Sequence, residues 1–214
     1  MAYSIKAYSI KETFYSIQGE GYHSGRPAIF LRFAGCNLWT GREEDRADAV
    51  CTFCDTEFVG VDGEGGGKFK NAADLAAHVR SFWPDQSPPF VVCTGGEPLL
   101  QLDSELVEAL HANSCVIAVE TNGTLEPPAG IDWICVSPKA DSQLLLKEGN
   151  ELKLVFPQSN ALPERFDALE FDHFFLQPMD GTALDVNTAE TLQYCLDNPR
   201  WRISIQTHKI LGVR

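Results

Sequence analysis

The sequence predicts an α/β fold in which a mostly parallel sheet forms a partial, open (β/α) barrel. Short apolar runs, mostly rich in β-branched or aromatic residues, recur along the chain, and helical patterns lie between several of them. This alternation is typical of a parallel sheet whose strands are joined by right-handed crossovers. The apolar runs number near six or seven, and the helical patterns are too few for eight complete units.

Each apolar run has the length of a strand that is buried on both faces of its sheet. An earlier stretch, Ile5–Ser16, alternates in character and is predicted to form an edge strand. The predicted buried strands are Ala28–Phe33, Phe90–Cys93, Val116–Val119, Trp133–Val136, Leu152–Phe156, Phe174–Leu176 and Arg202–Ile205.

Three stretches have helical patterns. They are Asn71–Phe82, Ser104–Ala112 and Asn187–Leu196. The first opens with Asn71, a favoured N-cap residue, and places Asp74 in its first turn.

Polar residues follow five of the predicted strands. Ligands bind at the carboxyl ends of parallel strands in barrels and in open α/β sheets, so these clusters predict a binding site at one rim of the sheet. The clusters are Thr94-Gly95-Gly96-Glu97-Pro98, Glu120-Thr121-Asn122-Gly123, Ser137-Pro138-Lys139, Gln177-Pro178 and Gln206-Thr207-His208-Lys209.

Length and composition are those of an ordinary globular protein. The 214 residues suit one domain, 1–214, and 44% of them are apolar against 22% charged. No apolar run is long enough to span a bilayer, and Met1–Phe14 lacks the order of a signal peptide, so we expect a cytoplasmic protein without a membrane partner.

The charge balance argues against a nucleic-acid partner. The chain carries 30 acidic and 17 basic residues, a net charge of −13, and no basic stripe. Binding to a phosphate backbone depends on clustered Lys and Arg. A local basic pocket for a small anion stays open.

Three of the seven cysteines lie in one stretch and suggest a metal site. Fourteen residues separate Cys36 from Cys51, and two separate Cys51 from Cys54. Three thiolates are one short of a closed zinc site or a fully ligated iron–sulfur cluster. The spacing alone therefore leaves two readings open: a [4Fe–4S] cluster with one free iron, or zinc with His23 or Asp55 as fourth ligand. Cys93, Cys115, Cys135 and Cys195 are scattered singly and are expected to be packed residues.

The segment after the predicted strand at Phe90 favours the cluster. Gly95 and Gly96 allow the backbone to approach a ligand closely, and Glu97 offers a carboxylate to an ammonium group. Alone, this segment reads as a strand-to-helix turn. Together with three cysteines it indicates a cluster beside a site for an amino-acid group.

Eight segments, which run from near the N-terminus to the last residues, resemble one known family. They are Phe14–Gly21, Leu31–Leu38, Cys54–Thr56, Thr94–Leu99, Glu120–Gly123, Val136–Lys139, Leu176–Pro178 and Gln206–Lys209. In these segments the chain is similar to the radical S-adenosylmethionine (SAM) superfamily and, within it, to the 7-carboxy-7-deazaguanine synthases.

The cysteine spacing departs from the superfamily pattern, in which three residues and then two usually separate the cysteines. Here residues 37–50 are interpreted as an inserted loop in the cluster-binding segment. The charged stretch Arg42–Asp48 within it is interpreted as a solvated excursion.

The resemblance implies a (β/α)6-type radical SAM barrel with reduced helix content. It also implies a lyase that converts 6-carboxy-5,6,7,8-tetrahydropterin into 7-carboxy-7-deazaguanine with loss of ammonia, in queuosine and 7-deazapurine biosynthesis. A 5′-deoxyadenosyl radical derived from SAM would take hydrogen from C6 of the pterin, and the ring would contract through a radical rearrangement. A homodimer and an electron donor such as flavodoxin are the implied partners.

The resemblance also assigns roles to residues. The [4Fe–4S] ligands would be Cys36, Cys51 and Cys54, and Thr56 would bind Mg²⁺, although by sequence alone it reads as a turn cap. The SAM contacts would be Phe53, Thr94, Gly95, Gly96, Glu97, Asn122, Ser137, Lys139 and Gln177. The substrate contacts would be Ile17, Gln18, Gly19, Glu20, Arg32, Thr94, Glu120, His208 and Lys209.

Within that substrate set, two charge assignments follow from chemistry. Arg32 or Lys209 is expected to pair with the pterin carboxylate. Glu120 is expected to accept hydrogen bonds from the aminopyrimidine edge.

Two other functions remain as alternatives. A glycyl-radical-enzyme activase shares the cluster and SAM motifs, but the segments at Gln18–Gly21 and Gln206–Lys209 argue against it. A zinc-stapled binding module without catalysis would contain zinc and no iron.

Overall fold

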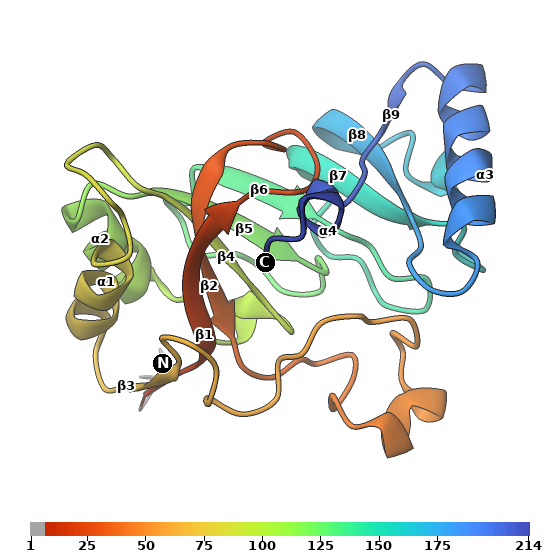
Figure 1. Ribbon diagram of the computed structural model, residues 1–214. Helices are drawn as coiled ribbons and strands as arrows, with labels where there is room; N and C mark the ends of the chain where they lie inside the picture. Colours follow the sequence, from red (N-terminus) through yellow and green to blue (C-terminus); the bar gives the residue numbers. More distant parts are fainter. Residues whose placement is uncertain (1–6) are drawn as a thin grey trace.

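The computed structural model describes residues 7–214, which form one nine-stranded sheet beside four α-helices (Figure 1). The strand order is β3-β1-β2-β4-β5-β6-β7-β8-β9. The strands are β1 (Tyr8–Ile17), β2 (Pro27–Phe33), β3 (Gly67–Phe69), β4 (Phe90–Gly95), β5 (Val116–Thr121), β6 (Trp133–Val136), β7 (Glu148–Phe156), β8 (Glu170–Pro178) and β9 (Trp201–Ile203).

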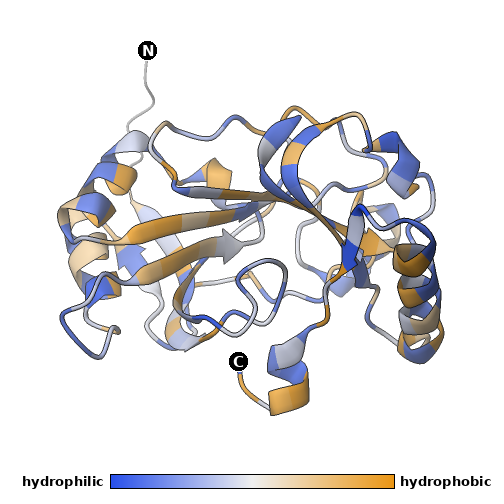
Figure 2. Cartoon of the chain, turned by 90° about the horizontal axis from the view of Figure 1, so that it is seen from above, coloured by the Kyte–Doolittle hydropathy of each residue, from blue (hydrophilic) through white to orange (hydrophobic). Residues whose placement is uncertain are grey.

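The sheet is open, as the sequence predicted. Strands β2 and β4 to β9 are parallel, whereas β1 is antiparallel to both of its neighbours, β2 and β3. Among the described residues β3 and β9 form the two edges and do not pair with each other. Seen from above, the sheet curves between the helix pair at one end and α3 at the other (Figure 2). The predicted partial barrel is therefore confirmed.

The predicted edge strand at Ile5–Ser16 is placed wrongly. Strand β1 lies inside the sheet, because the three-residue strand β3 pairs with Tyr8–Ile10 and covers that side. Ile5 and Lys6 lie outside the described residues. Strand β3 was not predicted, since Gly67-Lys68-Phe69 has no apolar run. The single-domain assignment of residues 1–214 stays a prediction.

All three predicted helices are present: α2 has the predicted bounds, whereas α1 and α3 have shifted ends. The α-helices are α1 (Ala72–Arg80), α2 (Ser104–Ala112), α3 (Leu184–Asp197) and α4 (Thr207–Leu211), and three short 3₁₀ helices are η1 (Glu43–Asp48), η2 (Pro98–Leu100) and η3 (Pro163–Arg165). The side chain of Asn71 caps α1 by accepting the N–H of Asp74 at 2.8 Å, as predicted. No helix in residues 7–214 has the length and apolar character to cross a membrane.

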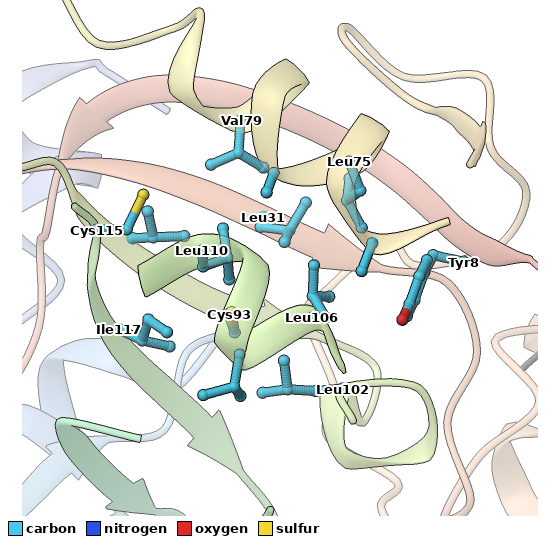
Figure 3. Close-up of a cluster of buried hydrophobic side chains, with 14 of the residues drawn as sticks. Tyr8, Leu31, Leu75, Val79, Cys93, Leu102, Leu106, Leu110, Cys115 and Ile117 are labelled. Atoms are coloured by element: carbon cyan, nitrogen blue, oxygen red, sulfur yellow. The ribbon is translucent and has the colours of Figure 1, made fainter. Parts of the chain in front are cut away.

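The main core lies between the helix pair and the outer face of the sheet. Leu75 and Val79 of α1 and Leu106 of α2 pack against Leu31 on β2 (Figure 3). A second core lies under α3 against β7 and β8. Cys93, Cys115 and Cys135 are buried, and Cys195 packs at the edge of the second core, so all four are packed residues as predicted.

The opposite, concave face changes character along the strands. Near their starts it is apolar, with Phe90, Val92 and Ala118 packed together. Towards the carboxyl ends of the same strands the inward positions become polar, with Thr94 on β4 and Glu120 on β5. The parallel arrangement of the strands thus gathers the polar residues at one rim.

Candidate active site

A cavity of about 480 Å³ opens at the carboxyl ends of the parallel strands. Every site residue predicted from the sequence lines it, with the exception of Glu97. These lining residues are Ile17, Gln18, Gly19, Glu20, Arg32, Cys36, Cys51, Phe53, Cys54, Thr56, Thr94, Gly95, Gly96, Glu120, Asn122, Ser137, Lys139, Gln177, His208 and Lys209.

The ends of the inserted loop are tied together near its base. The carbonyl of Leu38 accepts the N–H of Val50 at 3.1 Å and that of Cys51 at 3.4 Å, while the N–H of Leu38 donates to Sγ of Cys36 at 3.4 Å. The loop therefore returns to its starting point. The fourteen intervening residues do not separate Cys36 from the other two cysteines in space.

The three clustered cysteines line one cavity, and a single ion and a cluster make different demands on their sulfurs. Within residues 7–214 no three His, Cys, Asp or Glu side chains converge tightly enough to hold a single metal ion. A tetrahedral zinc site with Zn–S bonds near 2.3 Å needs sulfurs about 3.8 Å apart. A [4Fe–4S] cluster binds each thiolate through a different iron and fits a wider triangle.

The three thiols also differ electrostatically. The neighbouring Cys51 lowers the pKa of Cys54, whereas burial raises the pKa of Cys36.

The glycine pair after β4 packs directly against the first cysteine. The N–H of Glu97 donates to the carbonyl of Gly35 at 2.9 Å. A Cβ at Gly96 would lie 2.2 Å from that oxygen and 2.8 Å from Cβ of Cys36. Only glycine fits this junction, which fixes the end of β4 relative to the cysteine turn.

The carboxylate of Glu97 faces the protein instead of the cavity. The side chain is fully buried and accepts the N–H of Leu99 at 3.0 Å, the hydroxyl of Thr121 at 2.8 Å and the N–H of Asn122 at 2.8 Å. Burial raises its pKa even though these bonds favour the charged form. Glu97 therefore joins the ends of β4 and β5, and its contact with the ammonium group of SAM stays a prediction.

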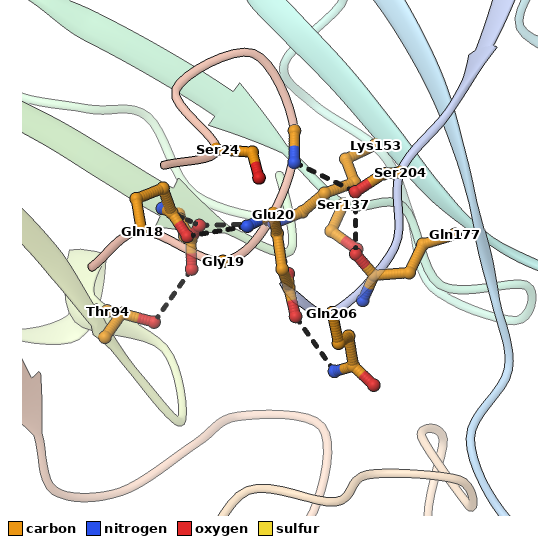
Figure 4. Close-up of polar contacts among 12 residues, drawn as sticks. Gln18, Gly19, Glu20, Ser24, Thr94, Ser137, Lys153, Gln177, Ser204 and Gln206 are labelled. Atoms are coloured by element: carbon orange, nitrogen blue, oxygen red, sulfur yellow. Dashed lines mark hydrogen bonds and ion pairs between the residues drawn. The ribbon is translucent and has the colours of Figure 1, made fainter. Parts of the chain in front are cut away.

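A buried lysine holds two cavity carboxylates together (Figure 4). Nζ of Lys153, on β7, lies 2.6 Å from Oε2 of Glu20 and 3.2 Å from Oε1 of Glu120. Burial alone would raise the pKa of Glu20, but the charge of Lys153 and its hydrogen bond outweigh it and place the pKa at about 2. Glu20 is therefore ionised over the physiological pH range.

Amides and a hydroxyl complete this network. Gln18 and Thr94 donate to Glu120 at 3.0 and 3.3 Å, and Nε2 of Gln206 donates to Glu20 at 2.9 Å. Figure 4 shows these side chains converging from the β1–β2 loop, β4 and the C-terminal segment. The two carboxylates are thus held in fixed positions on the cavity wall.

The C-terminal segment docks on the loop after β1. The N–H of Thr207 donates to the carbonyl of Gly19 at 2.9 Å, and a Cβ at Gly19 would lie 2.0 Å from Nδ1 of His208. This close approach brings His208 to the cavity. Lys209 follows at the rim and binds Asp55 at 2.9 Å and Asp180 at 2.6 Å.

Other predicted site residues form hydrogen bonds within the chain. Nε of Arg32 donates to Glu12 at 2.8 Å, which leaves the guanidinium on the cavity wall beside a carboxylate. Nζ of Lys139 donates to the hydroxyl of Ser137 at 2.8 Å. The hydroxyl of Ser204 donates to Gln177 at 3.1 Å.

The chain resembles curated proteins over nearly its whole length. It is 61% identical over 208 residues to a 7-carboxy-7-deazaguanine synthase of Bordetella pertussis, a match that covers 97% of this chain and 99% of the relative. It is 62% identical to the synthase of Caulobacter vibrioides, with 96% and 99% covered. The chain belongs to the 7-carboxy-7-deazaguanine synthase family.

A solved structure with a similar fold supports the same family assignment. The crystal structure of QueE from Escherichia coli matches with a TM-score of 0.71 and 28% identity, and the match covers 94% of both chains. No family model matches the sequence. Membership of the synthase family confirms the resemblance inferred from the motifs and sets aside the glycyl-radical activase and the zinc-stapled module.

Sequence reasoning missed several residues of this synthase cavity. The main ones are Lys153 and Gln206, with Lys11, Glu12 and Arg214 also on the cavity wall. A signal for Lys153 was present, because it is a lysine inside a strand predicted to be buried on both faces. Gln206 stood in a polar cluster already assigned to the rim.

Replacing Glu97 tests whether this residue is structural. In cofactor-free protein, Glu97→Ala leaves three buried donors without an acceptor and is expected to lower the free energy of unfolding by at least about 2 kcal/mol. The exposed Glu108→Ala is the matched control and should have little effect. Chemical denaturation measures both. Unchanged stability of Glu97→Ala would contradict the structural role.

Replacing Gly96 tests the junction with the cysteine turn. Gly96→Ala forces Gly35 and Cys36 to move, so we expect a loss of about 1–3 kcal/mol in unfolding free energy together with a lower iron content after anaerobic reconstitution. Denaturation and iron analysis provide the two readouts. Wild-type values in both would show that the junction tolerates a side chain.

Proposed function

We propose that this synthase-family enzyme converts 6-carboxy-5,6,7,8-tetrahydropterin into 7-carboxy-7-deazaguanine with loss of ammonia. The observation that carries the proposal is the convergence of three cysteines, a glycine turn and a lysine-bridged carboxylate pair on one cavity. The first two features suit a cluster with SAM, and the third suits a purine-like or pterin-like ring.

The cysteines fit the implied cofactor. Cys36, Cys51 and Cys54 would hold a [4Fe–4S] cluster with one iron left for SAM. The cluster and SAM would supply the one-electron chemistry that removes hydrogen from C6 of the pterin. An external electron donor such as flavodoxin belongs to the proposal, because the cluster must be reduced in each cycle.

The rim residues would orient SAM. The backbone of Gly95 and Gly96 lines the cavity immediately beside Cys36, which suits the amino-acid end of SAM. Ser137 and Lys139 are already joined by a hydrogen bond at the next strand ends. Phe53, Thr94, Asn122 and Gln177 complete the proposed contacts.

The carboxylate pair would select the pterin by its hydrogen-bond donors. Glu20 and Glu120 are acceptors, and the aminopyrimidine edge of a pterin presents N–H donors. Lys153 holds both carboxylates in place and keeps Glu20 charged, so little reorganisation is needed on binding. Ile17, Gln18, Gly19 and His208 would enclose the ring.

The substrate carboxylate would bind on the opposite side of the ring. Arg32 offers a planar guanidinium, and Lys209 offers an ammonium group already shared by Asp55 and Asp180. We propose that Thr56, next to Asp55, contributes a hydroxyl to a Mg²⁺ ion that also binds substrate oxygens. A homodimer is likewise proposed, and light scattering would measure it.

The decisive assay is anaerobic. Reconstituted protein is incubated with the carboxylated pterin, SAM, Mg²⁺ and dithionite, and the deazaguanine acid is measured by mass spectrometry. We expect product only in the complete mixture. Protein that carries a full cluster and cleaves SAM but leaves the pterin unchanged would overturn the assigned substrate.

Lys153→Met tests the charged pair. Without the ammonium, two partly buried carboxylates face each other, one of them is expected to keep a proton at neutral pH, and an acceptor for the pterin is lost. We expect the KM for the pterin to rise at least tenfold, which corresponds to about 1.4 kcal/mol of binding free energy. As the pH rises and that proton leaves, the KM should fall part of the way back to the wild-type value.

Two further variants control this experiment. Lys147 is exposed, so Lys147→Met should retain the wild-type KM. Lys153→Arg keeps the charge, so its KM should lie between those of the wild type and Lys153→Met. Thermal unfolding checks that each variant is folded. A wild-type KM in folded Lys153→Met would rule out the proposed role of the lysine.

Thr56→Ala tests the metal role. We expect the Mg²⁺ concentration for half-maximal rate to rise at least tenfold, about 1.4 kcal/mol, with iron content unchanged. The exposed Thr52→Ala, in the same turn, is the control. The same magnesium dependence in both variants would assign Thr56 to turn capping instead.

A further inference from the structure

The inserted loop touches the cysteine turn through one arginine. Most of Arg42–Asp48 is exposed, as the solvated-excursion interpretation expects, but Arg46 is only partly exposed. Its Nη1 donates to the carbonyl of Thr52 and to that of Cys54, both at 3.0 Å. One guanidinium nitrogen therefore bridges two carbonyls of the Cys51–Cys54 turn, those of Thr52 and Cys54.

The guanidinium is itself held in place from two sides. It lies over the ring of Trp39, with 4.1 Å from Cζ to the ring centroid, and its Nε donates to Glu43 at 2.7 Å. Trp39 is buried and meets Phe58 edge-on at 5.6 Å. The arginine is thus anchored to the body of the protein as well as to the loop.

The position of Arg46 also brings charge to the cysteines. Its two carbonyl contacts place the guanidinium beside the turn that carries Cys51 and Cys54. Charge and hydrogen bonding around a cluster help to set its reduction potential. Glu43 offsets part of this charge, but its side chain is mostly exposed and screened by water.

We propose that Arg46 is a positioning residue for the iron–sulfur cluster: it clamps the Cys51–Cys54 turn through the two carbonyls and stabilises the reduced cluster by its charge. The inserted loop then acts as the carrier of this arginine. The inference rests on the proposed function, because it requires a cluster on Cys36, Cys51 and Cys54.

The matched pair of variants is Arg46→Met and Arg42→Met. Arg42 lies in the same loop, is exposed, and pairs only loosely with Glu44, at 3.8 Å. In anaerobically reconstituted protein we measure iron release to a chelator and the midpoint potential of the cluster by spectroscopic titration. Arg46→Met is expected to release iron about tenfold faster, as with other residues that position metal ligands, and to show a lower potential. Arg42→Met is expected to match the wild type.

Two more variants separate clamping from charge. Arg46→Lys keeps the charge but loses the planar guanidinium that lies over Trp39 and binds Glu43, so iron release should be accelerated while the potential falls less than in Arg46→Met. Glu43→Gln keeps both carbonyl contacts and removes a negative charge, so the potential should stay or rise. Circular dichroism and thermal unfolding of the cluster-free variants confirm that each one folds.

The outcomes are distinguishable. If wild type and Arg42→Met hold no iron and sulfide, the proposed function itself fails. If both hold a cluster and folded Arg46→Met retains it with the same release rate and the same potential, the role of Arg46 is wrong. If Arg42→Met changes as much as Arg46→Met, the effect belongs to the loop charge in general, which also overturns the proposal.

Discussion

The buried ammonium of Lys153 is the interaction on which the carboxylate-lined side of this cavity depends. It joins Glu20, in the loop after β1, to Glu120, at the end of β5. Glu20 lies 133 residues from Lys153 in the sequence, and Glu120 lies 33 residues from it. Without a cation, two carboxylates in this buried position would repel each other and one would be neutralised. Through Glu20 and Gln206 the same network also anchors the C-terminal segment.

The cofactor side is organised by close backbone contacts. The glycine turn after β4 packs on the Cys36 turn, Glu97 fastens that turn to the end of β5, and Leu38 closes the inserted loop. These contacts fix the cysteines relative to the sheet before any cluster binds. The two halves meet in one cavity, so SAM and a pterin would be held side by side.

Sequence patterns predicted the rim well because parallel strands bring their carboxyl ends together. Each polar cluster after an apolar run therefore had to lie near the others, and Thr94, Glu120, Ser137 and Gln177 do. The direction in which each side chain points could not be predicted in this way. Glu97 follows a strand like its neighbours, yet it turns inward, since three donors from β5 and its own turn converge there. Long-range partners such as those of Lys153 and Arg46 cannot be inferred from local spacing.

The most direct test of this account is a crystal structure of the anaerobically reconstituted protein with SAM and the carboxylated pterin. The account predicts a four-iron cluster on three cysteines, with the aminopyrimidine edge of the pterin within hydrogen-bond distance of Glu20 and Glu120. A pterin bound away from that pair, or cysteines too far apart to share one cluster, would contradict it.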